Sequence, residues 1–253
     1  MMDQKRAADG IVPVQRDAFG HQLLDYWRGD HGLLEVIERD DGYISISGPV
    51  RGYFAPPEDW HPGDRAALMC VRGRVLDVGS GAGRHDLYLQ EQGFDVTALD
   101  NSPLALDVCR ARGVVHTLLK PVTLLSPDDG PFDTVLMMGG NYGLMGGWTR
   151  GRWLLRRLHR LTTAEGRLIV CSRDPYGTDS PLHLAYHARN RARGRMSGQV
   201  RIRVRYLSHV GPWFDYLLAS RAEMEAMLAG TGWHVSSYLG DGEPGYLAVI
   251  DKG

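Results

Sequence analysis

Apolar runs and helix-like stretches alternate along the chain from residue 74 onward. Five short runs rich in Val, Leu and Ile have the length of buried strands, over residues 74–78, 95–99, 114–118, 134–138 and 167–171. Helical patterns separate several of them, over residues 84–92, 103–112 and 149–161. Strands joined by helices of this length form right-handed crossovers, which produce a parallel sheet covered on both faces. The alternation therefore predicts an α/β fold with a doubly wound, mostly parallel sheet.

The C-terminal segment is expected to close this sheet. Residues 220–230 have a helical pattern, and residues 233–238 and 246–250 are typical of two strands joined by a turn over 240–245. A hairpin of this kind makes one strand antiparallel to the rest of the sheet. We therefore predict a mostly parallel sheet that ends in an antiparallel C-terminal hairpin.

Two segments lie outside the alternating core. Residues 15–70 are expected to form an N-terminal helical cap, with helices near 19–27 and 63–70. Residues 175–218 follow the fifth strand and contain one helical pattern and the alternating run 199–207. Open α/β sheets bind ligands outside the carboxyl ends of their strands, so we expect this insertion to act as a lid.

A chain of 253 residues is expected to form one domain with a single large core. The predicted domain consists of the cap over 15–70, a cofactor-binding core over 71–174, the lid over 175–218 and the closing helix and hairpin over 219–253.

The stretch VLDVGSGAGR, residues 75–84, carries the strongest chemical signal. An apolar strand leads into glycines at positions 79, 81 and 83, and a helix follows. Glycine allows a tight turn and a close approach of the backbone to a ligand, and the helix N-terminus lies directly behind it. The first strand is therefore expected to end in a ligand-binding loop.

Two details of this loop favour a cationic ligand over a dinucleotide. The spacing is G-x-G-x-G, whereas the dinucleotide fingerprint requires G-x-G-x-x-G/A and Arg84 occupies its last position. Asp77 precedes the first glycine by two residues, and its carboxylate would repel a pyrophosphate. S-adenosylmethionine (SAM) has no phosphate and carries positive sulfonium and amino groups. The loop therefore suits SAM and disfavours NAD.

Asp100 ends the next predicted strand, 17 residues after Gly83. A carboxylate at this place can accept both ribose hydroxyls of a nucleoside. An alternative is that Asp100 caps the helix that starts near Ser102 and Pro103. We predict the ribose role because Asp100 follows the appropriate strand after the appropriate loop.

The ordered segments VLDVGSGAGR, VTALDNSP, FDTVLMMGG and EGRLIV resemble the motif set of class I SAM-dependent methyltransferases, over roughly residues 70–175. The resemblance implies a Rossmann-like fold, SAM as the cofactor and S-adenosyl-L-homocysteine (SAH) as its product. The cofactor-binding residues that we predict on this basis are Asp77, Gly79, Ser80, Gly81, Gly83, Asp100, Asn101, Met138 and Gly139. One departure concerns the adenine, because residues 120–125 lack the acidic residue that many relatives carry there.

The acceptor side of the site is less clearly marked. Asn141 and Tyr142 follow the fourth strand and are predicted to contact the substrate, although they lack the prolines of amine-methylating relatives. His209 is the candidate catalytic base because histidine titrates near neutral pH. Seven arginines between positions 189 and 205 form either a solvated surface or a wall for an anionic substrate, for which Arg205 is the candidate.

Charge and composition limit the partners that we expect. The formal net charge of −1 gives no general reason for a nucleic-acid or membrane partner, and no apolar run approaches 18 residues. Three distant cysteines fit neither a disulfide framework nor a zinc site, and the pair His183 and His187 lacks a third ligand, so no metal is expected. We therefore predict a cytoplasmic enzyme that methylates an O, N or C nucleophile of a small molecule, as in a natural-product tailoring step. Two alternatives are a nucleic-acid methyltransferase that uses the arginine cluster and a non-catalytic SAM-binding module.

Overall fold

The computed structural model describes residues 10–240 and 245–253. Within these residues the chain forms two compact units. Unit 1 contains the described residues of Met1–Trp60, Gly73–Ser126 and Ile202–Trp213. Unit 2 contains the described residues of His61–Arg72, Pro127–Arg201 and Phe214–Gly253. The division into cap, core, lid and closing segment stays a prediction, and most of the predicted turn over 240–245 lies outside the described residues.

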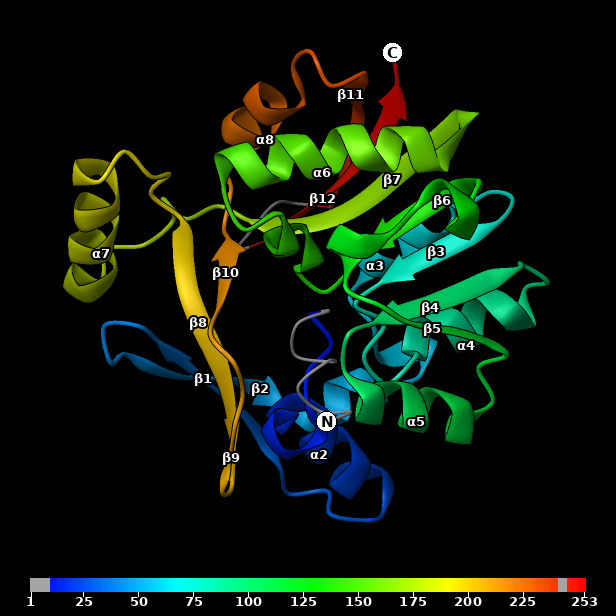
Figure 1. The fold of residues 1–253 in the computed structure, drawn as a ribbon, viewed down its shortest axis with the longest axis horizontal. Coiled ribbons are helices and arrows are strands. Elements are labelled where there is room, and N and C mark those ends of the chain that lie inside the picture. The colour runs from blue at the N-terminus through cyan, green and yellow to red at the C-terminus, as the bar shows by residue number, and fades with distance from the viewer. Residues whose placement is uncertain (1–9, 241–244) are drawn as a thin grey trace. The chain divides into compact units, whose positions relative to one another are not determined.

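Unit 1 contains the first three strands of the alternating core (Figure 1). Strands β3 (Val75–Val78), β4 (Val96–Asp100) and β5 (His116–Leu119) pair in parallel in this order. Helices α4 (Arg84–Glu91) and α5 (Pro103–Arg112) connect them. Every residue of β3 is buried, as expected for a strand with both faces covered. The predicted strand–helix alternation is confirmed here.

The N-terminal part of unit 1 differs from the expected helical cap. Helix α2 (Ala18–Trp27) is present as predicted, but it is followed by an antiparallel hairpin of β1 (Leu34–Arg39) and β2 (Ile44–Pro49). Strand β1 pairs on its other edge with β8 (Gln199–Tyr206), where Glu38 lies opposite Arg203. A short strand β9 (His209–Val210) pairs with β8 in turn. The cap is therefore part of a second, antiparallel sheet.

Unit 2 contains the remaining strands of the alternating core. Strands β6 (Phe132–Met137) and β7 (Thr162–Arg173) are parallel, and α6 (Trp148–Leu161) connects them. Strand β12 (Gly245–Lys252) pairs antiparallel with β7, and β11 (Trp233–Leu239) pairs antiparallel with β12. The α/β class, the mostly parallel strands and the antiparallel closing hairpin are thus as predicted.

The described residues of unit 2 also contain three further helices. Helix α3 (Pro62–Leu68) precedes β3, α7 (Pro181–Ala192) follows β7, and α8 (Arg221–Leu228) precedes β11. Ser220 caps α8, with Glu223 completing a capping box. After β10 (Phe214–Leu217) the Leu218 N–H donates to the Gly198 carbonyl at 2.9 Å.

Six short 3₁₀ helices fill the connections of the described chain. They are η1 (Val14–Arg16), η2 (Val50–Tyr53), η3 (Pro57–Asp59), η4 (Val122–Leu124), η5 (Pro127–Asp129) and η6 (Asn141–Met145).

Candidate functional site

The loop between β3 and α4 has the backbone conformation that its glycines allow. Gly79, Gly81 and Gly83 have φ values of +76°, +58° and +76°, in the left-handed region that other residues avoid. A Cβ atom on Gly83 would also lie 2.8 Å from Val114 Cγ2 and 3.1 Å from Cys109 Sγ. The third glycine is therefore required by both the backbone angle and the close packing of α5.

Asp100 is fastened to this loop by its carboxylate. Its Oδ2 accepts a hydrogen bond from the Gly81 N–H at 3.1 Å, and its Oδ1 accepts one from the Ser102 N–H at 2.9 Å. Ser102, and not Asp100, caps α5, because the Ser102 side chain accepts from the Ala105 N–H at 3.0 Å. The alternative capping role of Asp100 is thus wrong. Burial raises the pKa of Asp100 to about 6.

Three ionisable side chains are buried beneath the loop. Asp77 and Asp86 are 2% and 0% exposed, and the Oδ2 of Asp77 has no hydrogen-bond partner among the described residues. Burial raises the pKa of Asp77 to about 7, and burial together with the neighbouring Asp77 charge raises that of Asp86 well above its usual range. His85 Nδ1 lies 4.0 Å from Asp77 Oδ2, and burial lowers the pKa of this histidine to about 3. His85 is therefore neutral and does not balance the charge of Asp77.

The other predicted loop residues have more limited contacts. The Ser80 hydroxyl lies 3.4 Å from the Leu99 carbonyl oxygen. The Asn101 carbonyl accepts from the Val12 N–H at 2.9 Å, and its side-chain amide donates to the Gly10 carbonyl at 3.2 Å. The extended N-terminal segment thus runs past the end of β4.

Sequence reasoning missed the residues that attach this N-terminal segment to the site. Asp17, 1% exposed, accepts from the Gly20 N–H at 2.9 Å, the Ser102 hydroxyl at 2.7 Å and the Leu104 N–H at 3.2 Å. Burial raises the pKa of its carboxyl group. The side chain of Phe19, two residues later, lies beside Gly81.

A signal for the missed hairpin is present in the sequence. Residues 34–39 and 44–49 combine β-branched residues with alternation, and Asp41-Gly42 between them is a common hairpin turn. Glu35 lies on the first of these strands, and Tyr53 lies in the segment after the second. The Tyr53 hydroxyl donates to the Glu35 carboxylate at 2.9 Å.

Four predicted residues lie in unit 2, at and after the end of β6. Met138 is 2% exposed, and a Cβ atom on Gly139 would meet no atom within 4 Å. The Asn141 N–H donates to the Met138 carbonyl at 3.0 Å and so closes a turn. Tyr142 is fully buried with its hydroxyl 3.8 Å from Met227 Sδ, which contradicts the predicted substrate contact because the ring fills the core of unit 2.

Tyr216 on β10 contacts the loop after β6, and the sequence did not identify it as a contact. Its hydroxyl donates to the Gly140 carbonyl at 2.5 Å, and its ring packs where a side chain on Gly143 would lie. Gly143 therefore must lack a side chain for the ring to hold the loop after β6.

The two predicted lid residues have partners within unit 1. The His209 ring stacks on His21 with centroids 3.7 Å apart, and its Nδ1 lies 3.3 Å from the Gln15 carbonyl oxygen. Arg205 forms an ion pair with Glu38 at 2.8 Å, and Arg203 binds the same carboxylate at 2.9 Å. Glu38 thus neutralises the positive charge of Arg205 that we expected to bind an anionic acceptor. The prediction that Arg205 contacts the substrate therefore loses its basis.

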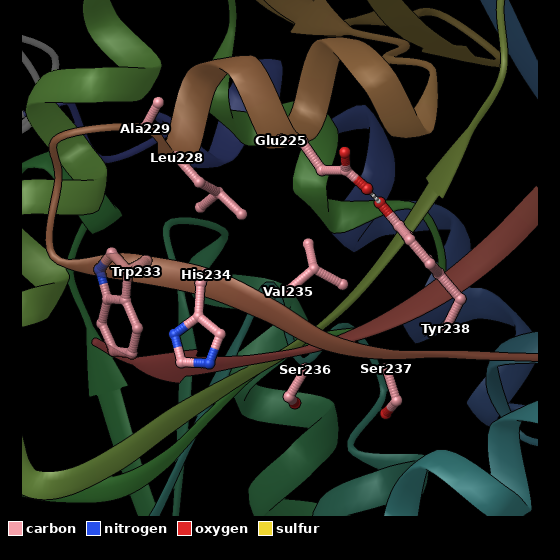
Figure 2. Close-up of a pocket in the computed structure, with 9 residues that line it drawn as sticks. All are labelled: Glu225, Leu228, Ala229, Trp233, His234, Val235, Ser236, Ser237 and Tyr238. Carbon is pink, nitrogen blue, oxygen red and sulfur yellow. Dashed lines mark hydrogen bonds between the residues drawn. The ribbon is translucent and has the colours of Figure 1, made fainter.

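A cavity of about 330 Å³ lies in unit 2 between α8 and β11 (Figure 2). Its lining includes Trp233, His234 and Leu228, and the Tyr238 hydroxyl donates to Glu225 at 2.9 Å at one end. None of the predicted site residues lines this cavity.

The described residues contain no group of three or more His, Cys, Asp or Glu side chains that could hold a metal ion. No helix among them is long and apolar enough to cross a membrane. The three cysteines are free thiols, and the buried Cys109 packs 3.2 Å from the Gly81 carbonyl.

The chain is similar to known methyltransferases. Residues 75–166 match the family described as a methyltransferase domain. An uncharacterized methyltransferase of Mycobacterium tuberculosis (strain ATCC 25618 / H37Rv) is 34% identical over 110 residues, which cover 40% of this chain and 43% of that protein. The match thus spans less than half of the length of this relative.

Two solved structures share the fold. A SAM-dependent methyltransferase of Bacteroides fragilis, in complex with SAH, aligns with a TM-score of 0.81 and 24% identity over 96% of this chain and 98% of its own. The CcbJ methyltransferase of Streptomyces caelestis aligns with a TM-score of 0.59 and 17% identity over 80% of this chain and 98% of its own. The predicted Rossmann-like fold is confirmed, and residues 75–166 are similar to a methyltransferase domain.

Proposed function

We propose that this protein transfers the methyl group of SAM to an O, N or C nucleophile of a small molecule and releases SAH. The observation that carries the proposal is the joint arrangement of the β3–α4 glycine loop and Asp100, whose carboxylate is bonded to the Gly81 N–H.

The chemistry of the loop fits a cationic nucleoside. The Asp77 carboxyl group is buried beside Asp86, its Oδ2 has no hydrogen-bond partner among the described residues, and the nearby His85 is neutral. A buried carboxyl group of this kind gains from a cation, because a positive charge compensates its lost hydration. A pyrophosphate would instead meet a negative charge, so the donor set favours SAM over NAD.

We assign the cofactor contacts to groups of this chain as follows. Asp100 accepts the ribose hydroxyls, Asp77 lies near the amino group, and the backbone of Gly79, Ser80, Gly81 and Gly83 lines the methionine part. Asn101, Met138 and Gly139 contribute further contacts, the last two through their backbone. When bound, SAM would supply an electrophilic methyl group on its sulfonium, whose sulfur leaves as the neutral thioether of SAH, so no covalent enzyme intermediate is required.

The residues of the chain then act chiefly by alignment and by exclusion of water. His209 is our candidate for the group that takes the acceptor proton. The Gln15 carbonyl near its Nδ1 can only accept a hydrogen bond, so Nδ1 carries the ring hydrogen and Nε2 is left to receive a proton. Asn141 is our candidate for a contact to the acceptor.

A small acceptor is favoured over a nucleic acid because three of the seven arginines between positions 189 and 205 have acidic partners. Arg203 and Arg205 are both paired with Glu38, and Arg201 lies 3.4 Å from Asp215. Arginines with acidic partners offer a polyanion little free charge. The segment 175–218 is proposed to act as the lid of the acceptor pocket.

Calorimetry on the purified protein tests the cofactor. SAM and SAH should bind, whereas NAD and ATP should not. Asp100→Ala should weaken SAM binding by about 1.5–3 kcal/mol, the range for hydrogen bonds to a charged group, or roughly 10- to 150-fold. Binding of NAD but not SAM, or an unchanged SAM affinity in folded Asp100→Ala, would contradict the proposal.

A second experiment identifies the acceptor. Transfer of labelled methyl from SAM should be measured against a panel of metabolites and against RNA and DNA. Methylation of a metabolite is expected. Methylation of nucleic acid with strongly salt-dependent binding would favour the nucleic-acid alternative, and SAM binding without transfer to any acceptor would favour the binding module.

A further inference from the structure

Two aromatic side chains of the N-terminal segment lie against the glycine loop. A Cβ atom placed on Gly81 would lie 3.5 Å from Phe19 Cζ and 3.5 Å from Tyr53 Cδ1. The two rings meet edge to face, with centroids 5.3 Å apart and planes at 80°. Both pack against a core cluster that includes Ala82, yet both are only partly buried. Each ring is therefore supported on its core side and retains open surface.

Glu35 lies behind Tyr53 and is held by neutral donors. Its Oε1 accepts from the Tyr53 hydroxyl at 2.9 Å and from Gln22 Nε2 at 3.4 Å, and its Oε2 accepts from the Ser47 hydroxyl. In the described part of the chain, no Lys or Arg forms an ion pair with Glu35, whereas Glu38 on the same strand has two. The negative charge of Glu35 is thus fixed in place but not neutralised.

The hairpin geometry explains how Glu35 obtains these partners. The register of β1 and β2 shifts after Glu35, so that Glu35 pairs with Gly48 and Val36 with Ile46. Ser47 is the extra residue of this bulge, and its hydroxyl donates to Glu35. Bulges redirect side chains and recur beside active sites.

We propose that Phe19, Tyr53 and Glu35 form a cation-binding wall at the glycine loop, which attracts the sulfonium charge of SAM and so favours SAM over SAH. Aromatic faces attract cations within about 6 Å of the ring, and a nearby carboxylate adds a direct charge interaction. SAH retains the amino group but has a neutral sulfur, so the difference between the two ligands isolates the sulfonium. Because the wall binds SAM more tightly than SAH, it also helps a new SAM molecule to replace the product SAH. This inference rests on the proposed placement of the cofactor at the β3–α4 loop.

The test compares the dissociation constants of SAM and SAH by calorimetry. Phe19→Leu removes the aromatic face but keeps apolar volume, and Glu35→Gln removes the charge but keeps a polar side chain. Each change should raise the Kd of SAM by about 3- to 20-fold, the span expected for a cation–aromatic or partly desolvated charge contact. The Kd of SAH should change less than about 2-fold, within ordinary context effects. Phe19→Met is a second apolar replacement in case Phe19→Leu does not fold.

Two matched variants serve as controls. Phe54→Leu removes an aromatic ring of the same cluster that stacks on Tyr26 and does not line Gly81. Glu91→Gln removes one negative charge from the exposed end of α4. Both should leave the ratio of the SAM and SAH constants unchanged.

The outcomes separate this inference from the proposed function. If Phe19→Leu and Glu35→Gln weaken SAM and SAH equally, or change neither, the cation-binding wall is wrong and these residues act only in packing. If Asp100→Ala also leaves both ligands unaffected, the cofactor site itself is wrong. A changed ratio in the wall variants, with both ligands weakened in Asp100→Ala, supports both proposals.

Discussion

Removal of the Asp17 carboxylate should destabilise the protein by about 3 kcal/mol. The carboxylate caps α2 through the Gly20 N–H, and loss of such a cap costs about 1 kcal/mol. Asp17→Ala also leaves the Ser102 hydroxyl and the Leu104 N–H without their acceptor, at about 1–1.5 kcal/mol for each partly buried group. Burial raises the pKa of Asp17, so part of these losses is offset when the buried acid is removed. The total corresponds to roughly a 150-fold change in the unfolding equilibrium.

Urea unfolding of the wild type, Asp17→Ala and Asp17→Asn measures this difference, provided that the slope of the free energy with urea stays the same. Asp17→Asn keeps one acceptor oxygen and should lose about half as much. A double-mutant cycle with Ser102→Ala should give a coupling free energy of at least about 1 kcal/mol. A loss below about 1 kcal/mol in Asp17→Ala, or equal losses in both variants, would show that Asp17 does not attach α2 to the loop after β4.

Three further predictions concern the site. Burial raises the pKa of Asp77 to about 7, and a bound cation favours its ionised form, so binding releases a proton and SAM affinity should increase as the pH rises toward about 7 and level off above it. Calorimetry should show this increase flattened in Asp77→Asn, and equal slopes in both proteins would refute it. Gly81→Val forces a side chain to φ +58° beside Phe19 and Tyr53, so it should abolish SAM binding while a cooperative thermal transition remains; normal binding would overturn the site assignment. His209→Ala should lower kcat on the acceptor by about 10²- to 10⁴-fold with SAM affinity unchanged, and an unaltered kcat would remove His209 as the base.

The core of the fold could be predicted because its signals are local. Apolar runs and glycine-terminated helices determine β3, β4, α4 and α5 within short windows, and α5 begins and ends at the expected residues. The G-x-G-x-G spacing with Asp77 and Asp100 likewise lies within 24 residues. Pattern and chemistry thus agree wherever the interacting groups are close in sequence.

What could not be predicted depends on distant pairing. The partner of Arg205 is Glu38, which lies on a strand of the N-terminal segment, and no local pattern couples the two. Tyr142 is a residue type that often contacts substrates, but its ring is buried against α8. The sequence does not reveal in which direction a side chain after β6 points. The N-terminal contribution to the loop was missed for the same reason, because Phe19 and Gly81 meet only in the folded chain.

The pairing of β1 with β8 has a consequence for synthesis of the protein. Glu38 and Arg203 are separated by 165 residues, so the ribosome completes the hairpin of β1 and β2 long before β8 exists. At about 5–20 residues per second, this interval lasts roughly 10–30 s. During it the unpaired edge of β1 offers free N–H and C=O groups, next to the exposed Ile44 and Ile46 of β2. Over that time the edge of β1 is open to pairing with other chains, and a shortened protein without residues 10–60 would leave β8 itself with an open edge.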